Sequence, residues 1–146
     1  MNYKERITPQ FINKLKPNEI FVFGSNTLGR HGKGAAKDAM KFGAKYGKGE
    51  GLYGQTYALP TKGEDLRKSL SLEDIKNAVN KFKECVEKNK GKKFLVTPIG
   101  CGLAGYDEKD IAPLFKCFIN NNEVFLPDGF WKILKKYISI NDENKL

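Results

Sequence analysis

The sequence predicts one α/β domain with a mixed, largely parallel central sheet. Short apolar segments alternate with amphipathic segments along the chain, and two apolar segments run directly into glycine-rich loops. Strands that alternate with helices are typical of βαβ units, whose strands are parallel. With 146 residues, 40% hydrophobic and 29% charged, the chain has the size and composition of one folded domain. We expect this domain to span residues 1–140, followed by a frayed polar tail over 141–146.

The expected elements alternate between helix and strand. In chain order they are a helix over 7–16, a strand over 19–23, a helix over 35–45, a strand over 53–59, a helix over 71–90, a strand over 94–99, a helix over 107–119, a strand over 123–126 and a helix over 130–138. The spacing of apolar residues distinguishes the two types, since helices repeat every three to four residues.

Local signals support each element in the first half of the chain. Thr8 and Pro9 are typical of an N-cap and a first-turn proline, which predicts the first helix. The strand over 19–23 is apolar on both faces, so we expect it near the centre of the sheet. The next helix carries small residues at a spacing suited to close packing, and Pro60 is expected to end the second strand.

The second half carries equally clear signals. Ser71 followed by acidic residues resembles a capping box and predicts the start of the longest helix. One face of this helix is expected to be buried through Leu72, Ile75, Val79, Phe82 and Val86. The segment 94–99 is continuously apolar, which predicts a third strand. Asp107 opens an acidic first turn, as is typical of helix N-termini.

Two glycine-rich loops are the most informative features of the chain. The first, over 24–35, follows the strand 19–23, and the second, over 100–106, follows the strand 94–99. Glycine lets backbone N–H groups approach a ligand closely, and a helix N-terminus beyond such a loop favours negative charge. Ligands of parallel sheets bind beyond the carboxyl ends of strands. The sequence therefore predicts one anion-binding crevice lined by both loops.

Neither loop is a standard nucleotide-binding motif. Arg30 and His31 stand where a P-loop has its lysine and hydroxyl residue, so the magnesium-binding hydroxyl is missing. The segment Gly100-Cys-Gly-Leu-Ala-Gly105 has the spacing of the dinucleotide fingerprint. That fingerprint opens the first βαβ unit, whereas only about forty residues follow here. These departures exclude a P-loop NTPase and a Rossmann dehydrogenase.

Cysteine usage and hydropathy limit the class of protein. Cys85, Cys101 and Cys117 form an odd set without C-x-x-C spacing, so we expect neither disulfides nor a metal site. Cys101 lies in a glycine loop but would need an activating environment to act as a nucleophile. The chain has no apolar run of about 18 residues and no apolar N-terminal segment. We therefore expect a cytoplasmic protein with no membrane partner.

The net charge of +9 favours an anionic ligand or partner. The lysines are scattered along the chain, and no basic motif interleaved with aromatic residues stands out. Two interpretations therefore stay open: an anionic small molecule or nucleic acid as the partner, and lysines that are simply solvated.

Four polar side chains lie where a ligand could reach them. Asn26 ends a buried strand, where its carboxamide could hold a sugar hydroxyl or form a turn. Lys62 follows another strand at the same expected edge of the sheet. Glu19 could accept from an exocyclic amine or could face solvent. His31, the single histidine, is either a general base or a solvent-exposed loop residue.

The chain resembles the macro domain superfamily from Glu19 to about Phe130. The resemblance is carried by Phe21-Val-Phe-Gly-Ser-Asn26, by Gly32-Lys-Gly-Ala-Ala36 and by Thr97-Pro-Ile-Gly-Cys-Gly-Leu-Ala-Gly-Tyr106. It is closest to the branch that contains terminal ADP-ribose glycohydrolases and DNA ADP-ribosyl glycohydrolase antitoxins. The resemblance implies a three-layer α/β/α fold, ADP-ribose or a related nucleotide as ligand, no further cofactor, and ADP-ribosylated nucleic acid or protein as a partner.

The resemblance also implies roles for individual residues. Glu19 falls at the acidic position that contacts the adenine amino group, and Asn26 falls at the distal-ribose asparagine. Lys62 matches the lysine that acts on the anomeric carbon, so Lys62 and Asn26 are expected to be catalytic. The expected ligand-binding residues are Glu19, Ser25, Asn26, Gly32, Gly34, Gly100, Cys101, Gly102, Leu103, Ala104, Gly105 and Tyr106.

One residue departs from the pattern of the glycohydrolases. Ala104 stands where they place a catalytic aspartate, and Asp107 is the nearest carboxylate that follows. The aromatic residue of the commoner macro domains is missing there as well. Two functions are therefore compared below. Lys62 favours hydrolysis of ADP-ribose from a modified macromolecule, and Ala104 favours a non-catalytic reader or sponge of an ADP-ribose-type signal.

Overall fold

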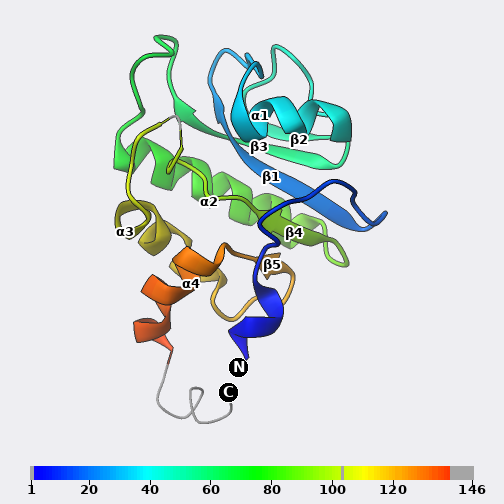
Figure 1. Cartoon of the computed structure of the whole chain (residues 1–146), viewed down its shortest axis with the longest axis vertical. Helices are drawn as coiled ribbons and strands as arrows, with labels where there is room; N and C mark the ends of the chain where they lie inside the picture. The colour runs from blue at the N-terminus through cyan, green and yellow to red at the C-terminus, as the bar shows by residue number, and fades with distance from the viewer. Residues whose placement is uncertain (1, 103, 139–146) are drawn as a thin grey trace.

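The computed structural model describes residues 2–102 and 104–138, and Figure 1 shows their arrangement. A five-stranded sheet has the order β2-β3-β1-β4-β5. Its strands are β1 (Glu19–Asn26), β2 (Gly51–Tyr53), β3 (Thr56–Lys62), β4 (Lys93–Val96) and β5 (Val124–Phe125). Neighbouring strands are parallel except for the antiparallel pair of β2 and β3. The predicted α/β class is confirmed, and β1 lies at the centre of the sheet as expected.

Short and long helices connect the strands. They are η1 (Tyr3–Arg6), α1 (Gly34–Ala39), η2 (Met40–Phe42), α2 (Leu72–Lys88), α3 (Glu108–Ile111), η3 (Ala112–Phe118), α4 (Asp128–Leu134) and η4 (Lys135–Tyr137). Helix α2 begins where predicted, because the Ser71 hydroxyl accepts a hydrogen bond from the Asp74 N–H at 3.1 Å. The helices expected over 35–45, 107–119 and 130–138 are each an α-helix continued by a 3-10 helix.

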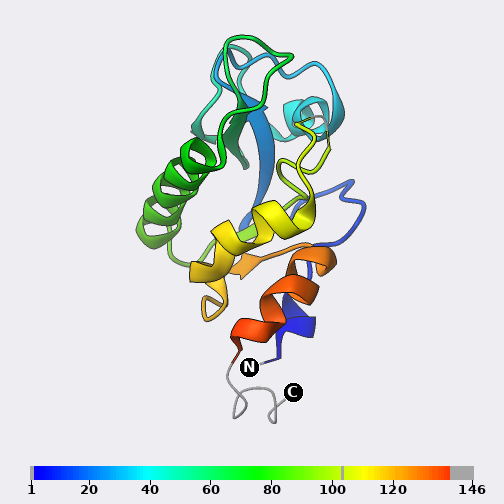
Figure 2. The same ribbon diagram turned by 90° about the vertical axis from the view of Figure 1, so that its left-hand side faces the viewer.

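Two hydrophobic clusters cover the two faces of the sheet. Ile20 and Val22 of β1 belong to the larger cluster, together with residues of α2, η3 and α4. Phe21 and Phe23 point to the other face and pack with alanines of α1. This alternation follows from the pleat of a strand. Figure 2 shows α2 and α1 on opposite sides of β1, which is a three-layer α/β/α arrangement. Along α2 the expected stripe is buried except for Leu72, which is 37% exposed.

The helix expected over 7–16 is wrong. Ile7 instead forms a parallel bridge with Leu126, next to the last strand. The Thr8 N–H donates to the Leu126 carbonyl at 2.9 Å, so these backbone groups extend the sheet rather than starting a helix. The segment beyond is irregular, with Phe11 82% exposed. Proline and N-cap signals did not reveal that a distant strand edge would compete for the same backbone.

The expected end of the second strand at Pro60 is also wrong. Strand β3 continues through Pro60 to Lys62, and β2 precedes it across a tight turn that the sequence interpretation merged into one strand. Proline is tolerated here because the register between β1 and β3 shifts between Ser25 and Asn26. The longer strand makes Lys62 the register partner of Asn26.

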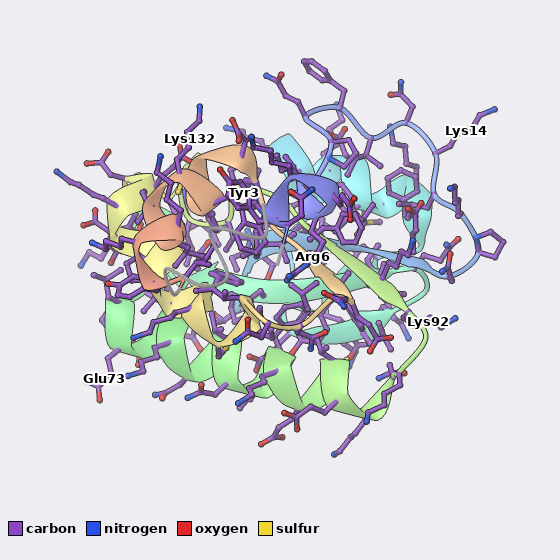
Figure 3. All side chains as sticks on the ribbon, turned by 90° about the horizontal axis from the view of Figure 1, so that it is seen from below. Tyr3, Arg6, Lys14, Glu73, Lys92 and Lys132 are labelled. Carbon is purple, nitrogen blue, oxygen red and sulfur yellow. The ribbon has the colours of Figure 1, made fainter. Side chains whose placement is uncertain are left out.

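Arg6 links the two ends of the described chain. Its guanidinium donates to the carbonyls of Phe118 and Ile119, both at 2.7 Å, and to that of Val124 at 3.0 Å. It also lies over the Trp131 ring, 4.9 Å from the centroid. Burial lowers the Arg6 pKa to about 10, so the group stays charged at neutral pH. Figure 3 shows Arg6 in the interior, whereas lysines such as Lys14 and Lys92 extend outwards.

Two further points concern membrane-spanning helices and the limits of the domain. Among the described residues, none of the helices combines the length and the apolar character needed to cross a membrane. The tail expected over 141–146 lies outside the described residues, so the domain limits stay a prediction.

We predict that Arg6→Lys lowers the free energy of unfolding by about 2–3 kcal/mol. A lysine ammonium cannot reach all three carbonyls in the planar geometry of a guanidinium, which leaves buried acceptors unpaired. Urea denaturation at neutral pH measures the change. Arg67→Lys is the matched control, because the Arg67 side chain is 89% exposed and its substitution is expected to change stability by under about 0.5 kcal/mol. Equal stability of the two variants would contradict the role given to Arg6.

Candidate functional site

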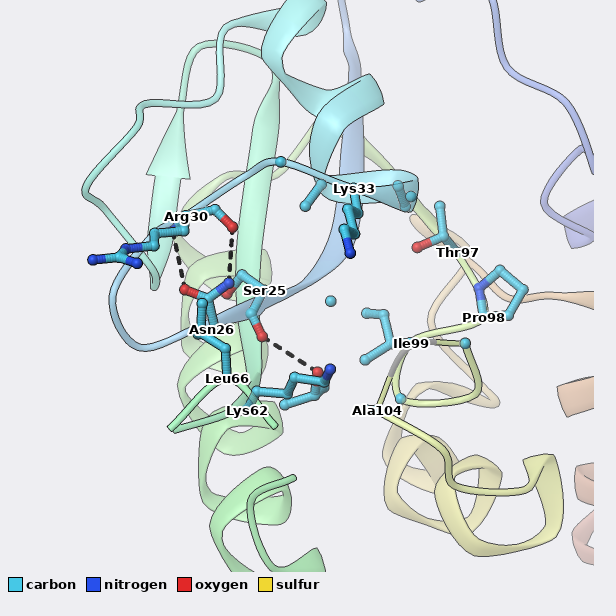
Figure 4. A pocket seen from close by; sticks show the side chains of 18 residues that line it. Ser25, Asn26, Arg30, Lys33, Lys62, Leu66, Thr97, Pro98, Ile99 and Ala104 are labelled. Carbon is cyan, nitrogen blue, oxygen red and sulfur yellow. Dashed lines mark hydrogen bonds between the residues drawn. The ribbon is translucent and has the colours of Figure 1, made fainter. Parts of the chain in front are cut away.

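A cavity of about 550 Å³ opens at the carboxyl ends of β1, β3 and β4 (Figure 4). The first glycine loop and the second glycine loop both line it, so the predicted convergence of the two loops is confirmed. The lining residues are Gly24, Ser25, Asn26, Arg30, Gly32, Lys33, Gly34, Ala35, Ala36, Thr61, Lys62, Leu66, Thr97, Pro98, Ile99, Gly100, Gly102 and Ala104.

The lining is cationic. Arg30, Lys33 and Lys62 contribute to it, and no acidic residue does within the described part of the chain. None of these three residues takes part in an ion pair with the other described residues. Figure 4 shows the Lys33 and Lys62 side chains extending toward the middle of the cavity, whereas the Arg30 guanidinium points away from it. The cavity therefore holds two unpaired ammonium groups and favours an anion.

Glycines leave parts of the cavity wall as bare backbone. A Cβ built on Gly32 or on Gly102 would meet no atom within 4 Å, so open space lies in front of both. In the described residues, the backbone N–H groups of Gly102 and Ala104 form no hydrogen bond. These donors are therefore available to a ligand.

The second glycine loop is braced by hydrogen bonds from its neighbours. The Ser69 hydroxyl donates to the Ala104 carbonyl. The Tyr106 hydroxyl donates to the Leu70 carbonyl at 2.5 Å, and the Tyr106 N–H donates to the Gly100 carbonyl at 2.9 Å. Tyr106 does not line the cavity. Tyr106 was expected to bind ligand. In the structure its hydroxyl and its N–H instead hold the second glycine loop against the segment that precedes α2.

Asn26 and Ser25 shape the first loop. The Asn26 side-chain amide donates to the Arg30 carbonyl at 2.8 Å, and its oxygen accepts from the Arg30 N–H at 2.9 Å. This is the turn-forming interpretation of Asn26, and it leaves one amide proton for a ligand. The Ser25 hydroxyl donates to the Gly49 carbonyl. Both residues line the cavity while their main polar bonds are made within the protein.

Glu19 is not brought to the cavity. It begins β1 at the opposite end from Asn26, about 23 Å away at the rise of an extended strand. Its carboxylate accepts from the Lys16 N–H at 2.8 Å. An acidic residue that starts a central strand faces the amino edge of the sheet, where no predicted loop lies. The expected contact of Glu19 with an adenine amino group is therefore incompatible with a ligand in this cavity.

His31 is buried rather than solvent-exposed. Only 4% of its surface is exposed, and its ring meets Phe23 edge-on at 5.2 Å between centroids. Its Nε2 lies 3.1 Å from the carbonyls of both Lys45 and Lys48, so it holds the loop that follows η2. His31 does not line the cavity, and the general-base interpretation has no support from its geometry.

Cys101 is a half-buried thiol that packs against the larger cluster. Burial raises its pKa to about 11, and the negative charges of Glu108, Asp107 and Asp110 contribute. A nucleophilic cysteine needs the opposite shift. All three cysteines are free. No group of three or more side chains suited to a metal ion occurs in residues 2–102 and 104–138.

The cavity gathers most of the expected site residues but not all. Those that line it are Ser25, Asn26, Gly32, Gly34, Lys62, Gly100, Gly102 and Ala104. Those that do not are Glu19, Cys101, Gly105 and Tyr106. Leu103 lies outside the described residues.

Several lining residues escaped the sequence interpretation. Lys33 stands between two expected glycines, so its place in the loop was a usable signal. Pro98 and Ile99 belong to the second loop motif and were also within reach. Leu66 carried no signal, because it lies in a charged connecting segment whose path only the fold defines.

We predict that alanine destabilises the protein at Gly100 but has little effect on stability at Gly102. Gly100 has φ +77°, and a Cβ there would lie 2.9 Å from Ile111 Cδ1, so Gly100→Ala is expected to cost about 1–3 kcal/mol of unfolding free energy. Gly102→Ala is expected to cost under about 0.5 kcal/mol, since open space surrounds that position. Urea denaturation of both variants measures this. A large loss of stability in Gly102→Ala would show that the loop is packed.

We predict that alkylation of Cys101 by iodoacetamide is slow at pH 8 and rises about tenfold per pH unit up to about pH 11. The thiolate is the reacting form, and the raised pKa of about 11 keeps the group protonated below that pH. The Cys85→Ser/Cys117→Ser variant isolates the signal, with mass spectrometry as the measurement. A rate that levels off below pH 9 would contradict the assignment and reopen a nucleophilic role.

Comparison with known proteins does not identify a family. No family model, no curated protein and no solved structure matches this chain. The likeness to macro domains therefore rests on the loop motifs alone, and the cavity is the structural feature that bears on function.

Proposed function

We propose that the cavity binds ADP-ribose or a close derivative. One observation carries the proposal: two glycine loops converge on a cavity that three basic side chains line and no acidic side chain among the described residues enters. Bare backbone N–H groups and ammonium groups together are the chemistry that recognises phosphate oxygens. The position at the carboxyl ends of parallel strands is where sheets of this class bind nucleotides.

The rest of the cavity suits the other parts of such a ligand. Its volume of about 550 Å³ lies in the range of small-molecule sites, about 300–1,000 Å³. Leu66, Pro98 and Ile99 give it an apolar portion that can accept a base or the carbon face of a ribose. The remaining amide proton of Asn26 can donate to a ribose hydroxyl.

A second candidate function is the release of ADP-ribose from a modified macromolecule, and the orientation of Lys62 favours it (Figure 4). In this reaction the Lys62 ammonium gives one proton to the departing atom of the macromolecule, and its nitrogen bonds to the anomeric carbon as the bond from that carbon to the macromolecule breaks. Water then bonds to the anomeric carbon and displaces the lysine, which takes up one proton of that water, and free ADP-ribose is released. The lining contains neither a carboxylate nor a histidine in the described residues, so general acid–base help would come only from lysine or water. This chemistry favours binding as the primary function.

We predict that the protein binds ADP-ribose in calorimetric titration and that Gly102→Ala weakens this binding by about tenfold or more. The added methyl group enters the open space in front of the loop, where the ligand is placed, while stability is expected to stay unchanged. The tenfold change corresponds to about 1.4 kcal/mol of binding free energy.

Incubation with ADP-ribosylated DNA and protein separates the two candidate functions. Release of ADP-ribose that is lost in Lys62→Met supports catalysis, and tight binding without release supports a reader. Absence of any affinity for ADP-ribose, together with steeply salt-dependent binding of unmodified DNA, would refute both and favour a nucleic-acid-binding protein.

A further inference from the structure

We infer that Lys33 is a ligand-binding cation that contacts the diphosphate and leaves Lys62 to the distal ribose. This inference rests on the proposed function and assigns a role to a residue that lies in the first loop motif but was not among the expected site residues. Three features of the cavity support it: the position of Lys33, the charge of the lining, and the different sides from which Lys33 and Lys62 enter.

The backbone on both sides of Lys33 directs its side chain into the cavity. Lys33 has an extended conformation, with φ −144° and ψ 155°, just before α1. Gly34 follows with φ +59°, a backbone conformation that residues other than glycine rarely adopt. Gly32 precedes it with open space around its Cα. Because neither neighbour has a side chain, Lys33 is the residue through which this turn of the loop presents a functional group.

Within residues 2–102 and 104–138, Lys33 has no ion-pair partner. No carboxylate of these residues lines the cavity there. Two ammonium groups that extend into one space repel each other, which raises the free energy of the empty cavity. A bound anion removes this repulsion, so a ligand with negative charge on two adjacent phosphates is favoured.

The two lysines enter the cavity from different elements. Lys33 extends from the side of α1, and Lys62 extends from the end of β3 (Figure 4). Arg30 lines the cavity as well, but its guanidinium points away from the middle. Among its described residues, the second loop offers the neutral N–H donors of Gly102 and Ala104. Lys33 is therefore the positive charge on the α1 side that can pair with phosphate while Lys62 stays next to Asn26, its register partner.

The test measures the affinities of ADP-ribose and ADP for the unsubstituted protein and four variants. Lys33→Met is expected to weaken the binding of both ligands by about tenfold, because both contain the diphosphate. Lys33→Arg is expected to restore most of the affinity. Lys62→Met is expected to weaken ADP-ribose binding while ADP binding stays within about threefold of the unsubstituted protein. Lys37→Met is the matched control, since Lys37 is exposed on α1 and does not line the cavity.

The dependence of affinity on salt concentration distinguishes the loss of a lysine–phosphate contact from a change in the shape of the cavity. The loss in Lys33→Met is expected to be large at about 0.05 M salt and to shrink toward 1 M salt, because screening weakens the lysine–phosphate attraction. A loss that is equal at both salt concentrations, or no loss at all, overturns the inference while the proposed function stands. Failure of the unsubstituted protein to bind either ligand refutes the proposed function instead.

Discussion

The parallel pairing of β1 with β3 and β4 is the constraint on which the rest of the structure depends. It brings three strand ends to one edge of the sheet, so that the loops after β1 and β4 and the last residue of β3 meet there. Pairing requires β1 to be buried on both faces, which its uninterrupted apolar run provides. The position of the cavity follows from this topology. Its chemistry follows from the glycines and basic side chains that line it.

Residues that hold the loops around the cavity differ from residues that face its open space. Asn26, Ser25 and Tyr106 make their bonds to backbone carbonyls or N–H groups and hold the loops in place. The functional surface is left to bare backbone and to lysines. Such a division explains how a site can be rigid without using its charges internally, because the hydrogen bonds that stabilise the loops join neutral groups.

The sequence predicted elements whose signals are local and failed where distant contacts decide. Strand β1, helix α2 and the convergence of both glycine loops followed from apolar runs, a capping serine and the rule for parallel sheets. The helix over 7–16 failed because Ile7 pairs with Leu126, more than a hundred residues away. Burial of His31 depends on carbonyls from a later loop, which no motif encodes. Residue type identified the loops, and only the fold assigned Lys33 to the cavity.

The bonds of Arg6 have a consequence for how the chain is synthesised. Its acceptors lie 112 to 118 residues further along, so these hydrogen bonds can form only after η3 and β5 have been synthesised. Closing so long a loop carries an entropic penalty that local helices do not face. Strands β1, β3 and β4 can therefore associate during translation before η1 joins β5 and α4.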